Sequence, residues 1–251
     1  MKKKIFVALL LTGLILSGCD QLGDIGIGPG SSKESVVEVQ EIQAVPTEAA
    51  ITEKEFFRDD MDDDPNKNWG LKVVAGLEDQ LVWSQVGGKL RLQTLPPNDT
   101  NFIFVSKKNN YKDVVITAEV TNQGPTDNAY SLVCRANADG WYEFRISSDG
   151  YYELLRFDQY LYDEGKNAYT NFIEKRLNST KIFTGLKTNQ FSLSCNGDTI
   201  SAFVNGEQLY FKKRPLSIED SSYSDGAIGF GLLGYGDSLD VMYDWVEATR
   251  P

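Results

Sequence analysis

The residues best suited to chemistry lie in one strand-like stretch between positions 141 and 157, where polar and aromatic side chains alternate with apolar ones. They are Trp141, Glu143, Arg145, Tyr151, Glu153 and Phe157. Aromatic rings stack on the apolar faces of sugar rings, while carboxylate and guanidinium groups hydrogen-bond hydroxyl groups. We therefore expect these side chains, joined by Arg135 from a neighbouring strand, to form a ligand-binding face suited to carbohydrate. The alternative is a solvated face that ion pairs hold together, with its aromatic rings covered by a loop.

A turn at Ser148-Asp149-Gly150 determines how this stretch folds back on itself. A three-residue loop with glycine in the left-handed position makes a type I turn followed by a bulge. That loop predicts three pairs of facing residues: Arg145 with Glu153, Phe144 with Leu154, and Ile146 with Tyr152. A two-residue loop would instead place charged side chains in the core, because a shift of one residue exchanges the two faces of a strand. A second aromatic and acidic segment, residues 157–164 with Tyr169 beyond it, is expected to be a rim loop of this face or a strand and turn.

Short strands are the elements that must position these residues. Alternation of apolar and polar residues in Lys89–Gln93 and Val114–Val120 is typical of half-buried strands. Asn205-Gly206, between two strand-like runs, is a strong signal for a two-residue hairpin turn. Many short strands, frequent turns and no convincing helical segment predict an all-β fold, a two-sheet antiparallel sandwich over residues 52–251.

Several segments carry a resemblance to a known family, namely Trp141–Ile146, Ser148–Tyr152, Ile200–Glu207, Gly226–Phe230 and Asp240–Trp245. Their order is similar to the middle and end of a concanavalin A-like jelly roll. Laminin-G-like, lectin-type and glucanase-type sandwiches share this fold, as do the 3-keto-disaccharide hydrolase-like domains of bacterial surface proteins. The resemblance implies a jelly roll over most of residues 55–250. Because one fold hosts many functions, it supports the architecture more than an activity.

Hydrolytic chemistry finds little support in the residue types. The chain has no histidine, which excludes Ser-His-Asp and Cys-His sites and the most common zinc ligand. Glucanases of the resembled fold usually carry Glu-x-Asp-x-x-Glu along one strand, and no Glu-x-Asp occurs in this sequence. Glu143 and Glu153 could face one another across strands, but Arg145 lies between them. Ion pairing lowers a carboxyl pKa, whereas a general acid needs it raised, so we predict structural ion pairs and no catalytic residue.

An acidic run that begins at Asp59 raises the question of a calcium site, since hard cations prefer oxygen ligands. An EF-hand loop starting at Asp60 fails because its sixth position is Pro65 rather than glycine. Domains of the resembled family often hold a structural cation between the first and last strands. The resemblance therefore implies a Ca²⁺ site in which Asp59 or Asp60 joins Asp240 or Asp244. The alternative is a solvated acidic loop.

The amino-terminal residues indicate where in the cell the protein is located. A basic segment, Lys2–Lys4, precedes the apolar stretch Ile5–Leu16, which is short for a spanning helix and is typical of a secretory signal. Leu16-Ser17-Gly18-Cys19 resembles the bacterial lipobox, which implies a signal peptide over residues 1–18 and acyl chains such as palmitate on Cys19. Residues 19–51 are expected to be a flexible linker. The predicted location is the bacterial cell envelope, outside the cytoplasm and anchored to the membrane by lipid. An ordinary signal with a chance cysteine is the alternative.

Export would place the other two cysteines in a compartment that permits disulfides. Cys134 and Cys195 both lie in strand-like runs, and we expect a bridge between neighbouring strands. The alternative is two buried free thiols that behave as small apolar side chains.

The net charge of −11 opposes nucleic acid as a partner, since such binding depends on clustered Lys and Arg. The sequence therefore predicts an envelope lipoprotein that displays a sandwich binding carbohydrate or another ligand without catalysis. One alternative is a glycoside hydrolase acting on disaccharides, including 3-keto-disaccharides. Another is a structural or adhesion module that binds an envelope protein.

Overall fold

The computed structural model describes residues 55–95, 99–236 and 238–251. The chain divides into two units, Met1–Ala49 and Ala50–Pro251, and all described residues belong to the second. The expected signal peptide, the lipidation site at Cys19 and the linker over residues 19–51 lie outside the described residues.

One antiparallel sheet has nine strands, seven of which follow one another in the order β14-β13-β12-β6-β19-β4-β3. Strand β1 pairs with β19, and β17 pairs with β13. The bounds are β1 (Arg58–Asp59), β3 (Leu81–Val86), β4 (Lys89–Thr94), β6 (Val114–Asn122), β12 (Thr188–Asn196), β13 (Thr199–Val204), β14 (Glu207–Gln208), β17 (Ser217–Glu219) and β19 (Asp240–Thr249).

The second antiparallel sheet has eight strands, with the order β10-β9-β8-β7-β18-β5-β2 and β11 paired to β9. The bounds are β2 (Trp69–Ala75), β5 (Thr100–Tyr111), β7 (Ala129–Ala136), β8 (Gly140–Ser147), β9 (Tyr151–Asp158), β10 (Tyr169–Asn171), β11 (Leu177–Asn178) and β18 (Gly226–Gly234). Strands β15 (Tyr210–Phe211) and β16 (Arg214–Pro215) form a small sheet of their own.

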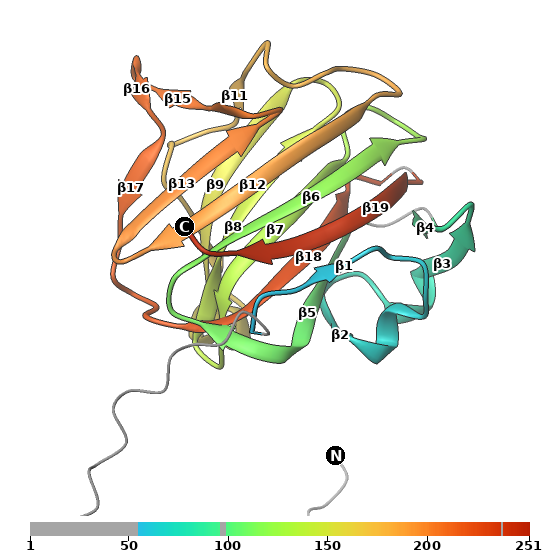
Figure 1. The fold of residues 1–251 in the computed structure, drawn as a ribbon, viewed down its shortest axis with the longest axis horizontal. Helices are drawn as coiled ribbons and strands as arrows, with labels where there is room; N and C mark the ends of the chain where they lie inside the picture. Colours follow the sequence, from blue (N-terminus) through green and yellow to red (C-terminus); the bar gives the residue numbers. More distant parts are fainter. Residues whose placement is uncertain (1–54, 96–98, 237) are drawn as a thin grey trace, which may run out of the picture. The chain divides into compact units, whose positions relative to one another are not determined.

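The two large sheets pack face to face around one apolar core, which confirms the all-β jelly-roll sandwich (Figure 1). The alternation in the sequence gives the reason. In β6 the residues Val114, Ile116, Ala118 and Val120 are fully buried, while those between them are partly exposed. Successive side chains of a strand point to opposite faces, so a period of two places one row in the core.

Both predicted turns occur. In the β8–β9 hairpin Arg145 faces Glu153, and Gly150 has φ +92°, a left-handed conformation that favours glycine. Asn205 and Gly206 connect β13 and β14 with φ values of 51° and 79°, as a type I′ turn requires.

The helices within the described ranges are all short. Residues 159–163, expected to be a rim loop or a strand and turn, form the helix α1 (Gln159–Asp163) instead. The carboxylate of Asp158 caps it by accepting a hydrogen bond of 3.0 Å from the amide of Leu161. Two 3₁₀ turns, Pro65–Lys67 and Glu78–Gln80, complete the set. None of the described helices is both long and apolar enough to cross a membrane.

A disulfide joins Cys134 of β7 to Cys195 of β12. The bridge itself is as predicted, but the expectation that it links neighbouring strands is wrong, because these strands belong to opposite sheets. Both cysteines point into the core, where the two sheets face each other, so the bond crosses the sandwich.

Candidate functional site

The outer face of the eight-stranded sheet, which points away from the core, carries six of the seven residues predicted to bind a ligand. Trp141 lies opposite Phe157 and Arg145 lies opposite Glu153, and Glu143 and Tyr151 follow the same alternation. The face has two halves with different surroundings. The Trp141 end is covered, whereas the Arg145 end borders a cavity.

The expectation that Trp141 and Phe157 stack on a ligand is wrong. Their rings stack on each other with centroids 3.8 Å apart, and their exposed fractions are 1% and 0%. The ammonium group of Lys72 from β2 lies 5.0 Å from the Trp141 ring and hydrogen-bonds Gln159 of α1. Ala168 belongs to the same apolar cluster as the two rings, and Leu161 and Tyr169 pack against that cluster. We call this cover, made by Lys72 and residues 159–169, the roof.

Glu143 lies at the centre of a buried hydrogen-bond network. Its Oε1 accepts a hydrogen bond of 2.7 Å from Arg145 Nε, and its Oε2 accepts bonds of 3.0 Å from Trp141 Nε1 and the Tyr169 hydroxyl. Burial raises the pKa of Glu143, but the charge of Arg145 and these hydrogen bonds outweigh it and hold the pKa below its ordinary value. Both oxygens are used, so Glu143 is a structural anion, as the ion-pair interpretation of the sequence predicted.

Tyr169 crosses the outer face above this network. Its ring lies 4.3 Å from the Arg145 guanidinium, and its hydroxyl accepts a hydrogen bond of 3.0 Å from Asn101 Nδ2 of β5. Burial and the nearby charge of Glu143 raise the pKa of Tyr169, so it remains a neutral donor. Tyr169 therefore forms the boundary between the roof and the open half of the face.

The open half contains a cavity of about 430 Å³, and we call it the Arg145 cavity. Tyrosines and polar residues contributed by distant strands form its walls, chiefly Tyr162, Tyr169, Tyr235, Thr100, Asn101, Arg145 and Glu153. Phe157 also borders it, with its ring covered by those of Tyr162 and Tyr169. Tyr235 has 41% of its surface exposed and presents an accessible aromatic ring at the cavity.

Unpartnered polar atoms concentrate at this cavity. Among the described residues, four buried side-chain nitrogen or oxygen atoms lack a hydrogen-bond partner, and three of them belong to residues of the cavity wall. They are Arg145 Nη2, Asn101 Oδ1 and Thr100 Oγ1. Buried polar groups are nearly always hydrogen-bonded, so one donor, one acceptor and one hydroxyl without partners mark a place that suits a polar molecule.

Glu153 and Asp99 line this cavity, and neither carboxyl group makes a close ion pair within the described part of the chain, although only Glu153 is half-buried. Burial raises the pKa of Glu153, and the positive charges of Arg145 and Arg176 offset this only in part. Asn171 Nδ2 donates a hydrogen bond of 3.1 Å to its Oε1. The carboxyl group therefore holds its proton to a higher pH than an ordinary surface glutamate does.

Tyr151 does not border the cavity but lies next to it through Arg176. The Arg176 guanidinium lies 5.0 Å from the Tyr151 ring and 5.8 Å from the Tyr235 ring. Ser147 and Asp149 of the β8–β9 turn hold Arg176 in place. The arrangement continues the aromatic surface of the cavity along the hairpin.

Arg135 does not join this face, contrary to expectation. A bulge in β7 shifts its register against β18 between Val133 and Ala136, and Arg135 adopts φ 54° there. The side chain is buried and donates hydrogen bonds to the backbone carbonyls of Lys112, Tyr223 and Gly197. The extra residue of the bulge reverses the alternation that the prediction assumed.

The four aspartates expected to hold calcium are used elsewhere. Each accepts hydrogen bonds or an ion pair from a nearby side chain: Asp59 from Trp69, Asp60 from Arg58, Asp240 from Arg91, and Asp244 from Lys89. The described residues contain no group of three or more His, Cys, Asp or Glu side chains placed to hold a metal ion. The cation site implied by the resemblance is therefore not supported by the positions of these residues.

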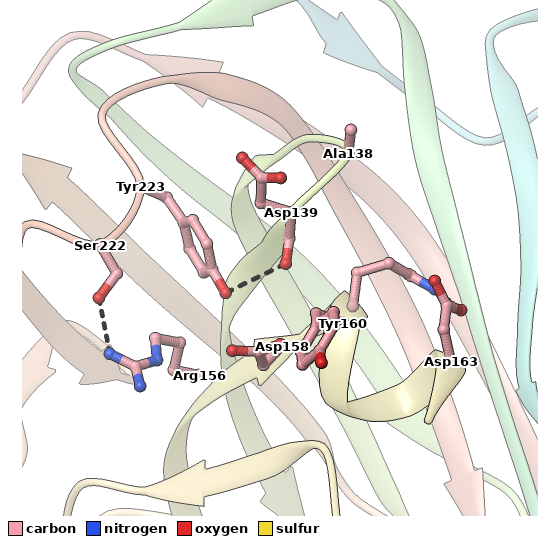
Figure 2. A pocket seen from close by; sticks show the side chains of 9 residues that line it. Ala138, Asp139, Arg156, Asp158, Tyr160, Asp163, Ser222 and Tyr223 are labelled. Atoms are coloured by element: carbon pink, nitrogen blue, oxygen red, sulfur yellow. Dashed lines mark hydrogen bonds between the residues drawn. The ribbon is translucent and has the colours of Figure 1, made fainter. Parts of the chain in front are cut away.

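A second cavity, of about 400 Å³, lies beside α1 (Figure 2). Asp139, Asp158, Tyr160 and Asp163 line it together with Arg156, whose Nη1 donates a hydrogen bond of 2.6 Å to Ser222 Oγ. Asp158 caps α1, and Tyr223 donates a hydrogen bond to the Asp139 carbonyl. None of the buried side-chain atoms without a partner in the described part of the chain belongs to a residue that lines this second cavity.

Sequence reasoning missed Thr100, Asn101 and Tyr235. Thr100 and Asn101 belong to β5, and Tyr235 follows β18. These two strands pair with each other, and β7 and β8 separate them from β9. The residues are far from β9 in the sequence, so local pattern does not reveal that they line the same cavity. The aromatic segment around residues 157–169 was the one signal for the wall, and it supplies Tyr162 and Tyr169.

No protein-family model matches the chain, and no curated protein has a similar sequence. Solved structures share its fold. The catalytic domain of the Thermotoga maritima laminarinase has a TM-score of 0.53 at 11% identity, covering 78% of this chain and 97% of that one. A Bacteroides ovatus mixed-linkage glucan GH16 protein with bound product has 0.53 at 9%, covering 77% and 99%. The Bacillus licheniformis β-glucanase has 0.51 at 13%, covering 78% and 98%. At these identities the likeness establishes the jelly roll alone.

Proposed function

We propose that the protein is a cell-envelope lipoprotein whose sandwich binds carbohydrate, without catalysis, in the Arg145 cavity. The observation that carries the proposal is the coincidence of three unpartnered buried polar atoms with three tyrosines around one cavity. Apolar and aromatic walls with a few convergent polar groups are typical of ligand sites.

The cavity chemistry suits a sugar ring. The Tyr235 ring, exposed at the cavity, offers a surface for the apolar face of a pyranose. Arg145 Nη2 can donate to a ligand hydroxyl, while Asn101 Oδ1 can accept from a neighbouring one. Glu153 adds a carboxyl group with a single side-chain partner. Small shifts of the tyrosine side chains are needed to bring the buried atoms into contact with the ligand.

The burial of Glu143 argues against hydrolysis. Glycosidases place two carboxyl groups on opposite sides of the bond to be cleaved. Glu143 and Glu153 have pKa values shifted in opposite directions, which is the pattern of an acid and base pair. However, Glu143 is 1% exposed and both its oxygens accept hydrogen bonds from the protein. A substrate cannot reach Glu143, so of these two glutamates only Glu153 is accessible at the cavity, and binding is the better supported function.

The similar solved structures include proteins named for glucans, which supports carbohydrate as the ligand class. The resemblance of Leu16-Ser17-Gly18-Cys19 to a lipobox supports the envelope location and the lipid anchor. Acyl chains on Cys19 would hold the sandwich at a membrane through buried CH₂ groups.

A glycan array with the full chain, followed by calorimetry on the retained oligosaccharide, tests the proposal. Tyr235→Ala should weaken binding at least tenfold, about 1.4 kcal/mol, because its exposed ring contributes to the cavity rather than to the core. Tyr160→Ala is the matched control, since that exposed tyrosine lines the second cavity. Equal loss in both variants, or none in either, would refute a carbohydrate site in the Arg145 cavity.

The same samples separate the alternatives. Release of reducing sugar from the retained oligosaccharide, abolished by Glu153→Gln, would establish a hydrolase instead. Retention of an envelope protein, with no glycan bound and no turnover, would establish an adhesion module.

A further inference from the structure

The β15–β16 hairpin lies outside both large sheets and forms the upper left edge of the molecule in Figure 1. Its turn is Lys212-Lys213, followed by Arg214, and all three side chains are exposed. Tyr210, next to the turn, has 52% of its surface exposed. This hairpin therefore presents three consecutive cations and an aromatic ring on a protein whose net charge is −11.

The turn holds its lysines in an unfavourable backbone conformation. Lys212 and Lys213 have φ values of 50° and 67°, in the left-handed region that Asn and Gly adopt most easily. The β13–β14 turn of the same protein uses that favoured pair, Asn205-Gly206. Strained residues often mark functional positions, and here the strain maintains two charges at the tip.

A second segment adds to the positive charge. Lys212 Nζ lies 2.6 Å from Glu174 Oε1, and the charges of Lys212 and Lys175 both lower the pKa of Glu174. Lys175 and Lys212 thus lie near one carboxylate, and Lys213 and Arg214 follow Lys212 in the sequence. A cavity of about 420 Å³ lies against Phe211, Lys212 and Arg214. Lys212 and Arg214 in its wall suit an anionic group such as phosphate.

We propose that this hairpin docks the sandwich on an anionic membrane surface, with lipid phosphates at the cationic turn. Lys and Arg side chains are attracted to anionic headgroups, and tyrosine is enriched at membrane interfaces. The projecting turn suits a flat surface. Screening limits the opposing net charge, because charges interact over about 10 Å at 0.1 M salt and the tip meets the surface first.

The lipid anchor proposed above would strengthen this contact. A tethered domain remains at a high effective concentration near the membrane, so that weak attraction is sufficient to orient it. The proposal does not depend on the Arg145 cavity, and loss of carbohydrate binding would leave it intact.

Hydrogen exchange of the full chain on lipid vesicles tests the proposal. Vesicles of phosphatidylcholine with phosphatidylglycerol should protect the backbone amides of residues 208–216 severalfold at about 0.1 M salt. Pure phosphatidylcholine vesicles should not, and high salt should remove the protection. Because the readout is local, insertion of the amino-terminal apolar stretch does not obscure it.

The decisive variant is Lys212→Asn with Lys213→Gly, which removes two charges and gives the turn its preferred residues. It should fold at least as well as the wild type and lose the protection. Lys112→Asn with Lys187→Asn removes the same charge from two exposed positions and should keep it. Protection that survives in the Asn-Gly variant would overturn the proposal. Protection by polygalacturonate or by inorganic phosphate, with none by vesicles, would also overturn it in favour of an anionic polymer or a free anion.

Discussion

The side chains of Glu143 and Arg145, two residues apart on the outer face of β8, form a buried ion pair with an Nε to Oε1 distance of 2.7 Å. Two charges removed from water are stable only when their remaining polar atoms are satisfied. Trp141 and Tyr169 satisfy the carboxylate, whereas Arg145 keeps one nitrogen without a partner at the cavity.

Glu143→Gln should lower the free energy of unfolding by about 3 kcal/mol, because it leaves the Arg145 guanidinium buried without its counter-ion. Chemical denaturation at pH 7 measures the change. Glu78→Gln, at an exposed position, is the control and should change it by less than about 0.5 kcal/mol. A small effect at Glu143 would show that the pair is not buried in solution.

The same variant should have a characteristic pH dependence. The pKa of Glu143 in the fold lies below its ordinary value of 4.5, so its ionisation stabilises the folded state at higher pH. That contribution is lost as the pH falls below about 4.5 through the folded pKa. The difference in melting temperature between wild type and Glu143→Gln should therefore shrink towards pH 3. A constant difference would contradict the lowered pKa.

Glu153→Gln should stabilise the fold at pH 7, whereas Glu143→Gln should destabilise it. Burial raises the pKa of Glu153 above 4.5, so the folded state disfavours the ionised form as the pH rises through that range. We expect the variant to melt at a higher temperature than the wild type at pH 7, with the gain disappearing near pH 4. Melting curves from pH 4 to pH 8 measure this, and a loss of stability at pH 7 would contradict it.

Arg135→Met should destabilise the fold by about 3 kcal/mol, since three backbone carbonyls lose a charged donor that is itself buried. Carbohydrate affinity should remain unchanged, because Arg135 lies away from the Arg145 cavity. Denaturation and calorimetry on one preparation separate the two effects. A selective loss of affinity would restore Arg135 to the binding site.

Removal of the disulfide by Cys134→Ala with Cys195→Ala should lower stability by about 4 kcal/mol on the chain-entropy estimate for a separation of 61 residues. Thermal unfolding with and without a reductant checks this. The double variant should be insensitive to the reductant, while the wild type should lose stability once its buried bond is reduced.

The β8–β9 hairpin shows what local sequence determines. The Ser148-Asp149-Gly150 turn and the alternation beside it predicted the pairing of Arg145 with Glu153 correctly, because both depend on neighbouring residues alone. Alternation also identified the face of Trp141 correctly. It could not show what lies above that face, since the roof combines Lys72 with a segment some ninety residues later.

Arg135 shows a second limit. A single extra residue in β7 reverses its direction, and no glycine or proline in the sequence marks the bulge. The unpartnered atoms of Thr100 and Asn101 were equally hidden, because their importance depends on the pairing of β5 with β18 and on the Tyr169 ring. Local pattern gives the strands, and only the closed sandwich brings these groups together.

The contact between Lys72 and Gln159 covers the Trp141 end of the outer face, so this end offers no open surface to a ligand. A linear polysaccharide in the proposed carbohydrate site would therefore extend from the Arg145 cavity on the side away from Trp141. On that proposal the site would favour a chain terminus over internal sugars, and the amount bound to a polymer would increase with the number of free ends rather than with its mass.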